Sequence, residues 1–343
     1  MTTNTPTPLE RPERPFLSVV IPCYNEEESL PHLYARLTKV LQKATDRYEI
    51  VFSNDGSRDQ TLMVIRDLVS KDPHVRGVDL SRNFGHQVCL TAGLDAARGE
   101  AIVMMDADLQ DPPELIPRLV AKWRLGADVV YAVRKKRHGE GAFKRATAAI
   151  FYRVLRYFTR ISIPVDTGDF RLIDRRALDA VLAIRESNRF LRGLFTWVGF
   201  RQEPVYYVRQ RRHAGETKYP LTKMMRFAMD GITSFSSVPL RFAMWVGLAS
   251  SALAFLYGLR VIYTGLFGGG VPGWASTTVS VLFFGGVQLF TIGLLGEYIG
   301  RIFDEVKRRP LYLVREVIEN KSVAAQRAES KIIPAYDAQK GTS

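Results

Sequence analysis

The stretch Ala101–Asp111, AIVMMDADLQD, joins an apolar run to a dense group of carboxylate and amide side chains. Apolar runs of this length without alternation are typical of buried parallel strands. Asp106 and Asp108 follow at once, although neighbouring carboxylates repel and lose hydration beside a core. A solvated turn would explain them, and Asp-Pro-Pro at 111–113 suits one. A divalent cation, which would neutralise the repulsion, is the other explanation.

Short apolar runs alternate with amphipathic segments along the first part of the chain. We expect strands at 17–22, 48–53, 75–80, 101–105 and 128–133, and helices at about 27–43, 61–70 and 87–97. This rhythm predicts a doubly wound, mostly parallel α/β sheet, in which ligands bind beyond the carboxyl ends of the strands. Polar motifs at Pro22–Glu26, Asn54–Ser57 and Asp106–Asp108 follow three strands. We expect them to share one crevice, which favours a binding site over a solvated turn.

Two apolar stretches near the C-terminus, 242–267 and 274–299, each exceed the roughly 20 residues that span a bilayer. Arg241 precedes the first, and Arg301 and further basic residues follow the second. The excess of positive charge at the outer ends predicts a two-helix transmembrane hairpin with both termini in the cytosol, anchored in the cytoplasmic membrane. The alternative is a buried helical hairpin in a soluble protein.

A net charge of +13 indicates an anionic partner. No aromatic–basic module is evident, so we expect no nucleic acid and attribute the charge to anionic membrane lipids and phosphates. The two cysteines predict a chain that does not depend on disulfides. Residues 1–16, rich in threonine, proline and charge, are expected to form a disordered tail.

Two basic amphipathic helices, one over about 143–158 and one within 220–240, are expected beside the membrane. Each either lies in the headgroup layer or packs on the core; for the second, which leads into the first span, we favour the headgroup layer. Residues 301–343 are expected to form a cytoplasmic tail. Within it, Arg309–Glu316 is too patterned for disorder, and we expect it to dock on a neighbouring subunit of a homo-oligomer.

Asp106, Asp108 and Gln110 offer hard oxygen ligands of the kind that Mg²⁺ or Mn²⁺ prefers. Such a metal site usually leaves coordination positions for water and a diphosphate. The cation would then act as a Lewis acid on a leaving diphosphate.

In combination, six motifs resemble the family 2 glycosyltransferases and, more narrowly, the polyprenyl-phosphate glycosyltransferases. They are Ser18–Glu26, Asn54–Ser57, Asn83–Gly85, Asp106–Pro113, Asp166–Arg171 and Arg212–Lys218. The resemblance covers roughly residues 17–316 and includes dolichol-phosphate mannose synthase and the bacterial undecaprenyl-phosphate glucosyltransferases. It implies a GT-A catalytic domain over 17–219, a nucleotide-sugar donor, a divalent metal, inversion at the anomeric carbon, and a polyprenyl phosphate acceptor.

The resemblance also implies roles for individual residues. The nucleotide-sugar would contact Pro22, Tyr24, Asn25, Glu26, Asp55, Asp106, Ala107, Asp108, Arg134, Arg212 and Lys218. The lipid phosphate would contact Arg134, Lys144 and Arg145, and the catalytic residues would be Asp106, Asp108 and Asp169. A phosphate monoester has a second pKa near 6, so the acceptor is largely ionised at neutral pH and needs no general base. The resemblance nevertheless implies that Asp169 is important for catalysis, and whether it abstracts a proton is left open.

Our first choice of reaction is the transfer of glucose from UDP-glucose to undecaprenyl phosphate, for cell-envelope glycan or lipid modification. Other sugars remain open. Alternatives are a membrane-tethered family 2 enzyme with another acceptor and a non-catalytic nucleotide-binding scaffold. A processive polysaccharide synthase is disfavoured, because the sequence has neither a Gln-x-x-Arg-Trp motif nor additional spans.

Overall fold

The structure is a computed structural model that describes residues 11–12, 16–134, 167–207, 238–267 and 273–320. The strands are β1 (Leu17–Cys23), β2 (Tyr48–Asn54), β3 (Val75–Leu80), β4 (Ala101–Met104), β5 (Val129–Arg134), β6 (Thr167–Asp174), β7 (Gln202–Tyr207) and β8 (Val314–Ile318). The helices are α1 (Ser29–Ala44), α2 (Thr61–Lys71), α3 (His86–Ala96), η1 (Pro113–Leu115), α4 (Ile116–Arg124), α6 (Arg175–Ala183), α7 (Leu191–Trp197), α9 (Val238–Leu266) and α10 (Trp274–Val306).

The strands form one eight-stranded mixed sheet in the order β7-β5-β6-β4-β1-β2-β3-β8. Its centre, β4-β1-β2-β3, is parallel, as the unbroken apolar runs predict. β6 runs antiparallel between β4 and β5, so the sheet reverses direction beside the strand that leads into Asp106. The sheet confirms the predicted α/β fold and its GT-A class.

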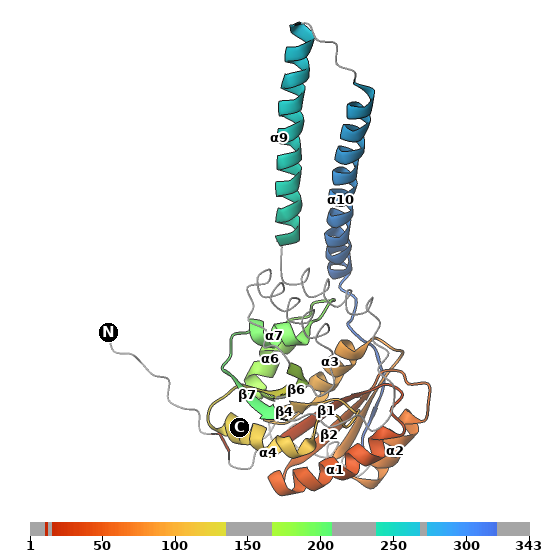
Figure 1. Cartoon of the computed structure of the whole chain (residues 1–343). Helices are drawn as coiled ribbons and strands as arrows, with labels where there is room; N and C mark the ends of the chain where they lie inside the picture. Colours follow the sequence, from red (N-terminus) through yellow and green to blue (C-terminus); the bar gives the residue numbers. More distant parts are fainter. Residues whose placement is uncertain (1–10, 13–15, 135–166, 208–237, 268–272, 321–343) are drawn as a thin grey trace, which may run out of the picture.

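Helices cover both faces of the sheet (Figure 1). One core cluster joins the sheet to α1, α2 and α4, and a second joins it to α3, α6 and α7. Because side chains alternate along a strand, β1 serves both clusters, with Val19 and Ile21 in the first and Val20 in the second. The central strands are therefore rigidly held, and their carboxyl ends form a fixed edge for the loops that follow.

α9 and α10 extend away from the sheet side by side and pack on each other (Figure 1). Each contains an apolar window, Phe242–Arg260 and Val279–Val306, that is long enough to cross a membrane. Only 11% of the first window and 0% of the second is buried, whereas a core helix of a soluble protein would be mostly buried. Exposed apolar surface of this extent indicates a membrane-associated hairpin rather than a soluble one.

β8 follows α10 and corrects one prediction. The segment expected to dock on a neighbouring subunit instead returns to its own sheet, where Val314–Ile318 pairs antiparallel with β3. The sheet of the catalytic domain therefore contains residues from both sides of the hairpin and extends beyond 17–219. The expected amphipathic helices at 143–158 and 221–235 lie outside the described residues, as do most of the N-terminal tail and 321–343.

Candidate active site

The carboxylates that follow β4 lie at the carboxyl edge of the sheet, next to β6. Met104 pairs with Arg171 in the antiparallel register of β4 and β6. Two residues further along each strand, this register brings Asp106 level with Asp169. Because β6 runs antiparallel to β4, the start of β6 lies at the carboxyl end of β4, and Asp169 comes to lie beside Asp106. If β6 ran parallel to β4, Asp169 would lie at the opposite edge of the sheet.

His86, the first residue of α3, completes this cluster. Its Nε2 atom lies 3.4 Å from Asp169 Oδ2 and 3.6 Å from Asp106 Oδ1. One ligand atom from each of the three residues lies within 4.8 Å of the others, a spacing that could hold a metal ion. Burial lowers the pKa of His86, but the hydrogen bond to Asp169 and the charges of both carboxylates outweigh it and raise the pKa above its usual value.

Arg192 of α7 neutralises Asp169. Its Nε and Nη2 atoms donate to the two oxygens of Asp169 at 2.7 and 3.1 Å, a bidentate pair. Burial raises the pKa of Asp169, yet Arg192 and His86 together hold it well below its usual range. Asp169 is therefore an ionised and firmly oriented carboxylate at neutral pH, and a weak proton acceptor.

Asp106, in contrast, is an incompletely satisfied carboxylate. Its Oδ1 atom is buried and has no hydrogen-bond partner among the described residues. Burial and the nearby charges of Asp169, Asp111 and Asp108 raise its pKa to about 7, although the His86 charge opposes the shift. A buried carboxylate oxygen without a donor costs free energy that a bound cation would recover. The donor set therefore fits a divalent metal.

The loop after Asp106 is held in a tight, specific conformation. Leu109 has a φ of 58°, in the left-handed region that a branched side chain rarely adopts. The backbone N–H of Gln110 donates to Asp108 Oδ1 at 3.1 Å, and the Tyr207 hydroxyl donates to the buried Asp111. These contacts fix Asp106, Asp108 and Gln110, the predicted metal ligands, within one short turn.

The residues predicted to hold the nucleotide follow β1 and β2 at the same edge. Tyr24 is 42% exposed, so its ring is accessible to a base. Asn25 has a φ of 57° and accepts from the Arg58 amide at 2.9 Å, which ties this loop to the one after β2. The Glu26 amide donates to Thr61 Oγ1, and Pro22 lies buried within β1.

Asp55 has a structural task that its motif did not predict. Its two oxygens accept from the amides of Phe84 and Gly85 at 2.7 and 3.0 Å. Gly85 needs its φ of 97°, which only glycine adopts readily, and α3 begins at the next residue. Asp55 thereby fixes the start of α3 and the position of His86. Its expected contact with the base or ribose remains a prediction.

Of the remaining basic residues predicted to bind phosphates, Arg134 is the one that lies within the described residues. Arg134 ends β5, in register with Tyr207. Arg212, Lys218, Lys144 and Arg145 lie outside the described residues. Sequence reasoning missed His86 and Arg192. His86 directly follows the Asn83–Gly85 motif and could have been found there, whereas no local pattern distinguishes Arg192 from the other arginines.

Comparisons with known proteins agree with this geometry. Residues 18–182 match the model of glycosyl transferase family 2, and residues 238–302 match that of the GtrB C-terminal hairpin. An uncharacterized glycosyltransferase of Bacillus subtilis, YkcC, is 52% identical over 89% of this chain and 95% of its own. The chain therefore belongs to the family 2 glycosyltransferases, within the group that carries this membrane hairpin.

Two further relatives have more specific names. A prophage bactoprenol glucosyl transferase homolog of Escherichia coli K12 is 44% identical, over 88% of this chain and 99% of its own. A prophage-derived bactoprenol glucosyl transferase of Shigella flexneri is also 44% identical, over 88% and 97%. Among solved structures, a mannosyltransferase of Pyrobaculum calidifontis aligns with a TM-score of 0.44 at 17% identity, over 86% of this chain and 87% of its own. That alignment is too loose to inform the site.

Proposed function

We propose that this glycosyltransferase moves glucose from UDP-glucose to undecaprenyl phosphate with inversion at the anomeric carbon. The observation that carries the proposal is the cluster around Asp106, at the carboxyl edge of the sheet, where one carboxylate oxygen has no hydrogen-bond donor among the described residues. The same chain also forms an apolar hairpin. The names of the relatives support glucose and a polyprenyl acceptor. The two features together fit a soluble charged donor and an acceptor that stays in the membrane.

Asp106, Asp108 and Gln110 are the residues that we expect to hold Mg²⁺ or Mn²⁺. His86 and Asp169 are the alternative partners of Asp106, but Arg192 already neutralises Asp169, and the raised pKa of His86 favours its protonated form, which cannot bind a metal. The cation would supply Lewis-acid stabilisation of the departing diphosphate. The side-chain oxygens of these three residues would hold the cation next to the diphosphate.

The transfer needs no proton acceptor. An oxygen of the acceptor phosphate forms a bond to the anomeric carbon, the bond from that carbon to the donor diphosphate breaks, and UDP leaves with the electron pair. A single displacement of this kind inverts the anomeric carbon. Asp169, ionised and oriented by Arg192, acts in this account by positioning and electrostatics.

The reaction is testable on the purified full chain in detergent. Undecaprenyl phosphate is incubated with UDP-glucose, UDP-N-acetylglucosamine or GDP-mannose and Mn²⁺, and the lipid fraction is analysed by mass spectrometry. We expect one hexose added to the lipid from UDP-glucose only. No lipid product from any donor, or a sugar product only in the aqueous fraction, would contradict the proposal.

Membrane topology is a separate part of the proposal, with both termini on the cytosolic side. Single cysteines introduced at Gly270, Thr5 and Lys340 can be probed in intact cells with an impermeant thiol reagent. The two native cysteines, Cys23 and Cys89, are buried and give little background. Only the cysteine at 270 should react; labelling at 5 or 340 would contradict the orientation.

A further inference from the structure

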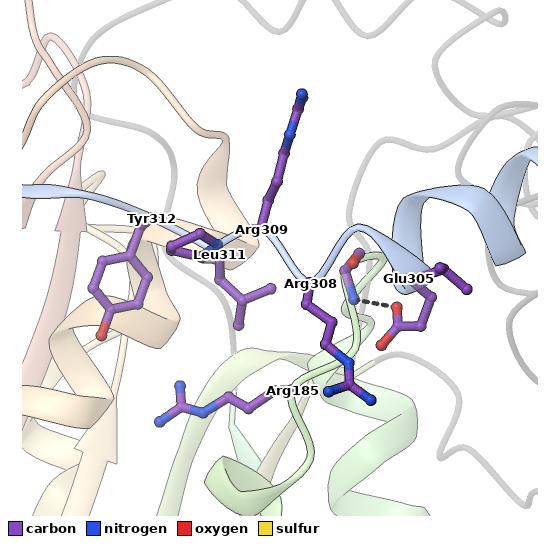
Figure 2. Close-up of a pocket in the computed structure, with 9 residues that line it drawn as sticks. Arg185, Glu305, Arg308, Arg309, Leu311 and Tyr312 are labelled. Carbon is purple, nitrogen blue, oxygen red and sulfur yellow. Dashed lines mark hydrogen bonds between the residues drawn. The ribbon is translucent and has the colours of Figure 1, made fainter.

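We propose that a cavity where α10 meets the catalytic domain binds the phosphate of an anionic phospholipid, separately from the acceptor. The cavity, about 830 Å³, forms between the last turn of α10, the linker to β8 and the loop after α6 (Figure 2). Its lining includes Arg185, Glu305, Val306, Arg308, Arg309 and Leu311. The proposal rests on membrane insertion of the hairpin and is independent of the sugar-transfer chemistry.

The position of the cavity matches the headgroup layer of a membrane. The apolar window of α10 contains 28 residues and ends at Val306, which lines the cavity. The last turns of this window already carry Glu297, Arg301, Asp304 and Glu305, so α10 leaves the apolar layer before it reaches the cavity. The cavity therefore lies on the polar side of the span, where the catalytic domain faces the lipid headgroups.

The cavity holds surplus positive charge. Within the described part of the chain, the guanidinium groups of Arg308 and Arg309 form no ion pair, whereas both oxygens of Asp95 bind Arg185 at 2.7 Å. The lining acid, Glu305, accepts from the Ser187 amide at 3.0 Å. Figure 2 shows the Arg308 guanidinium beside the loop that carries Arg185, while the Arg185 side chain points the other way and Arg309 extends away from both. Since Arg185 is committed to Asp95, Arg308 is the donor that we assign to a phosphate.

Arg308 also has a backbone conformation that suits glycine better than arginine. Its φ is 48°, and it stands directly after the C-cap of α10, where left-handed glycine commonly ends a helix. The Arg308 side chain lines the cavity. Backbone strain of this kind concentrates at binding and switch sites, and here it accompanies a charged side chain that forms no ion pair with any described residue. Val306 and Leu311 add apolar surface beside it, as a lipid glycerol and the start of an acyl chain require.

The cavity and the catalytic cluster lie at opposite ends of α3. Asp95, which binds Arg185, is nine residues from His86, so about 14 Å of helix separates the two sites. A phosphate held by Arg308 in this cavity would not reach Asp106. The ligand is therefore a membrane phospholipid and not the acceptor in its reactive position.

The test measures binding of radiolabelled short-chain phosphatidylglycerol to the delipidated full chain in neutral detergent. We expect saturable binding of one lipid per chain and none of phosphatidylcholine. Arg308→Gly should weaken binding about tenfold or more, the loss expected for one charge-assisted phosphate contact. Because glycine relieves the strained φ, the Tm of this variant should not fall. Lys307→Gln is the matched control, since it removes the neighbouring charge, whose Nζ lies over the Phe303 ring at 3.8 Å and not in the cavity lining.

Several outcomes would overturn the proposal. Equal weakening by Lys307→Gln would show a general charge effect. Equal binding of phosphatidylcholine, whose phosphate is neutralised by its own choline cation, would show that the cavity does not select an anionic lipid. Displacement by inorganic phosphate at the same concentrations would indicate a free-phosphate site. Tighter competition by undecaprenyl phosphate would assign the cavity to the acceptor. None of these readouts uses sugar transfer, so a failure here leaves the proposed reaction untouched.

Discussion

Two charged clusters in this domain, one buried around Glu49 and one partly buried around Asp106, differ in whether their charges are matched. Around Glu49, one oxygen accepts from Ser18 Oγ and the Arg98 amide, and the other accepts from Arg76. Arg76 also donates to Glu319, just after β8. Around Asp106, three carboxylates crowd together and a buried oxygen has no hydrogen-bond donor among the described residues. The first cluster is complete without a ligand, whereas the second has room for the cation that we propose.

The comparison predicts that charge removal at the Asp106 loop affects activity and leaves stability unchanged. Asp108→Asn should lower the transfer rate by more than about 100-fold, because it removes a charged ligand. The Tm should change little, because Asp108 is partly exposed and its charge is repelled by the neighbouring carboxylates, so that its loss does not destabilise the fold. Asp67→Asn, which removes an exposed carboxylate on α2, is the matched control. Near-normal transfer by Asp108→Asn in excess Mn²⁺ would contradict the metal assignment.

At the matched cluster we expect the opposite pattern. Arg76→Met should lower the free energy of unfolding by about 3–5 kcal/mol, because it leaves Glu49 buried without its charge partner. The affinity for UDP should change little in the protein that remains folded. Thermal melts in detergent would measure the loss, with Lys71→Met in an exposed ion pair as control. A drop no larger than that of the control would mean that the Glu49 cluster is not structural.

The raised pKa of Asp106 predicts that metal binding at this cluster depends on pH. Since the free carboxyl has a pKa of about 7, it binds a proton below that pH, and a cation must displace this proton. The affinity for Mn²⁺ should fall about tenfold per pH unit below 7 and level off above it. Calorimetric titration at pH 5.5, 6.5 and 7.5 would measure this. An affinity that is flat between pH 5.5 and 7.5 would show that Asp106 is not a ligand.

A smaller effect is expected where β8 joins the matched cluster. Glu319→Gln keeps an oxygen that Arg76 and Arg98 can use but removes its charge. The free energy of unfolding should fall by about 1 kcal/mol. Hydrogen exchange would show whether the loss is local to the β3–β8 pairing. A change as large as that of Arg76→Met would mean that β8, rather than Glu49, organises the cluster.

Hydrophobic patterns along the sequence predicted the central strands of the sheet but not its edge strand β8. The apolar runs gave β1 to β4 within a residue or two, because strands buried on both faces must be apolar throughout. β8 was missed, since its five residues pair with a strand more than 230 residues earlier and nothing local specifies that partner. The same holds for the site. The motifs predicted Asp106, Asp108 and Asp169 as site residues, and the structure brings Asp106 and Asp169 together. Arg192 reaches Asp169 only through the packing of α7.

The most direct test of the account is the number of Mn²⁺ ions bound by the wild-type chain and by Asp106→Asn, counted by electron paramagnetic resonance at pH 7.5 with UDP present. The account predicts one tightly bound ion in the wild type and loss of that ion in Asp106→Asn, whose Tm without metal should equal or exceed that of the wild type. One ion bound with equal affinity by both proteins, or none by the wild type, would contradict it.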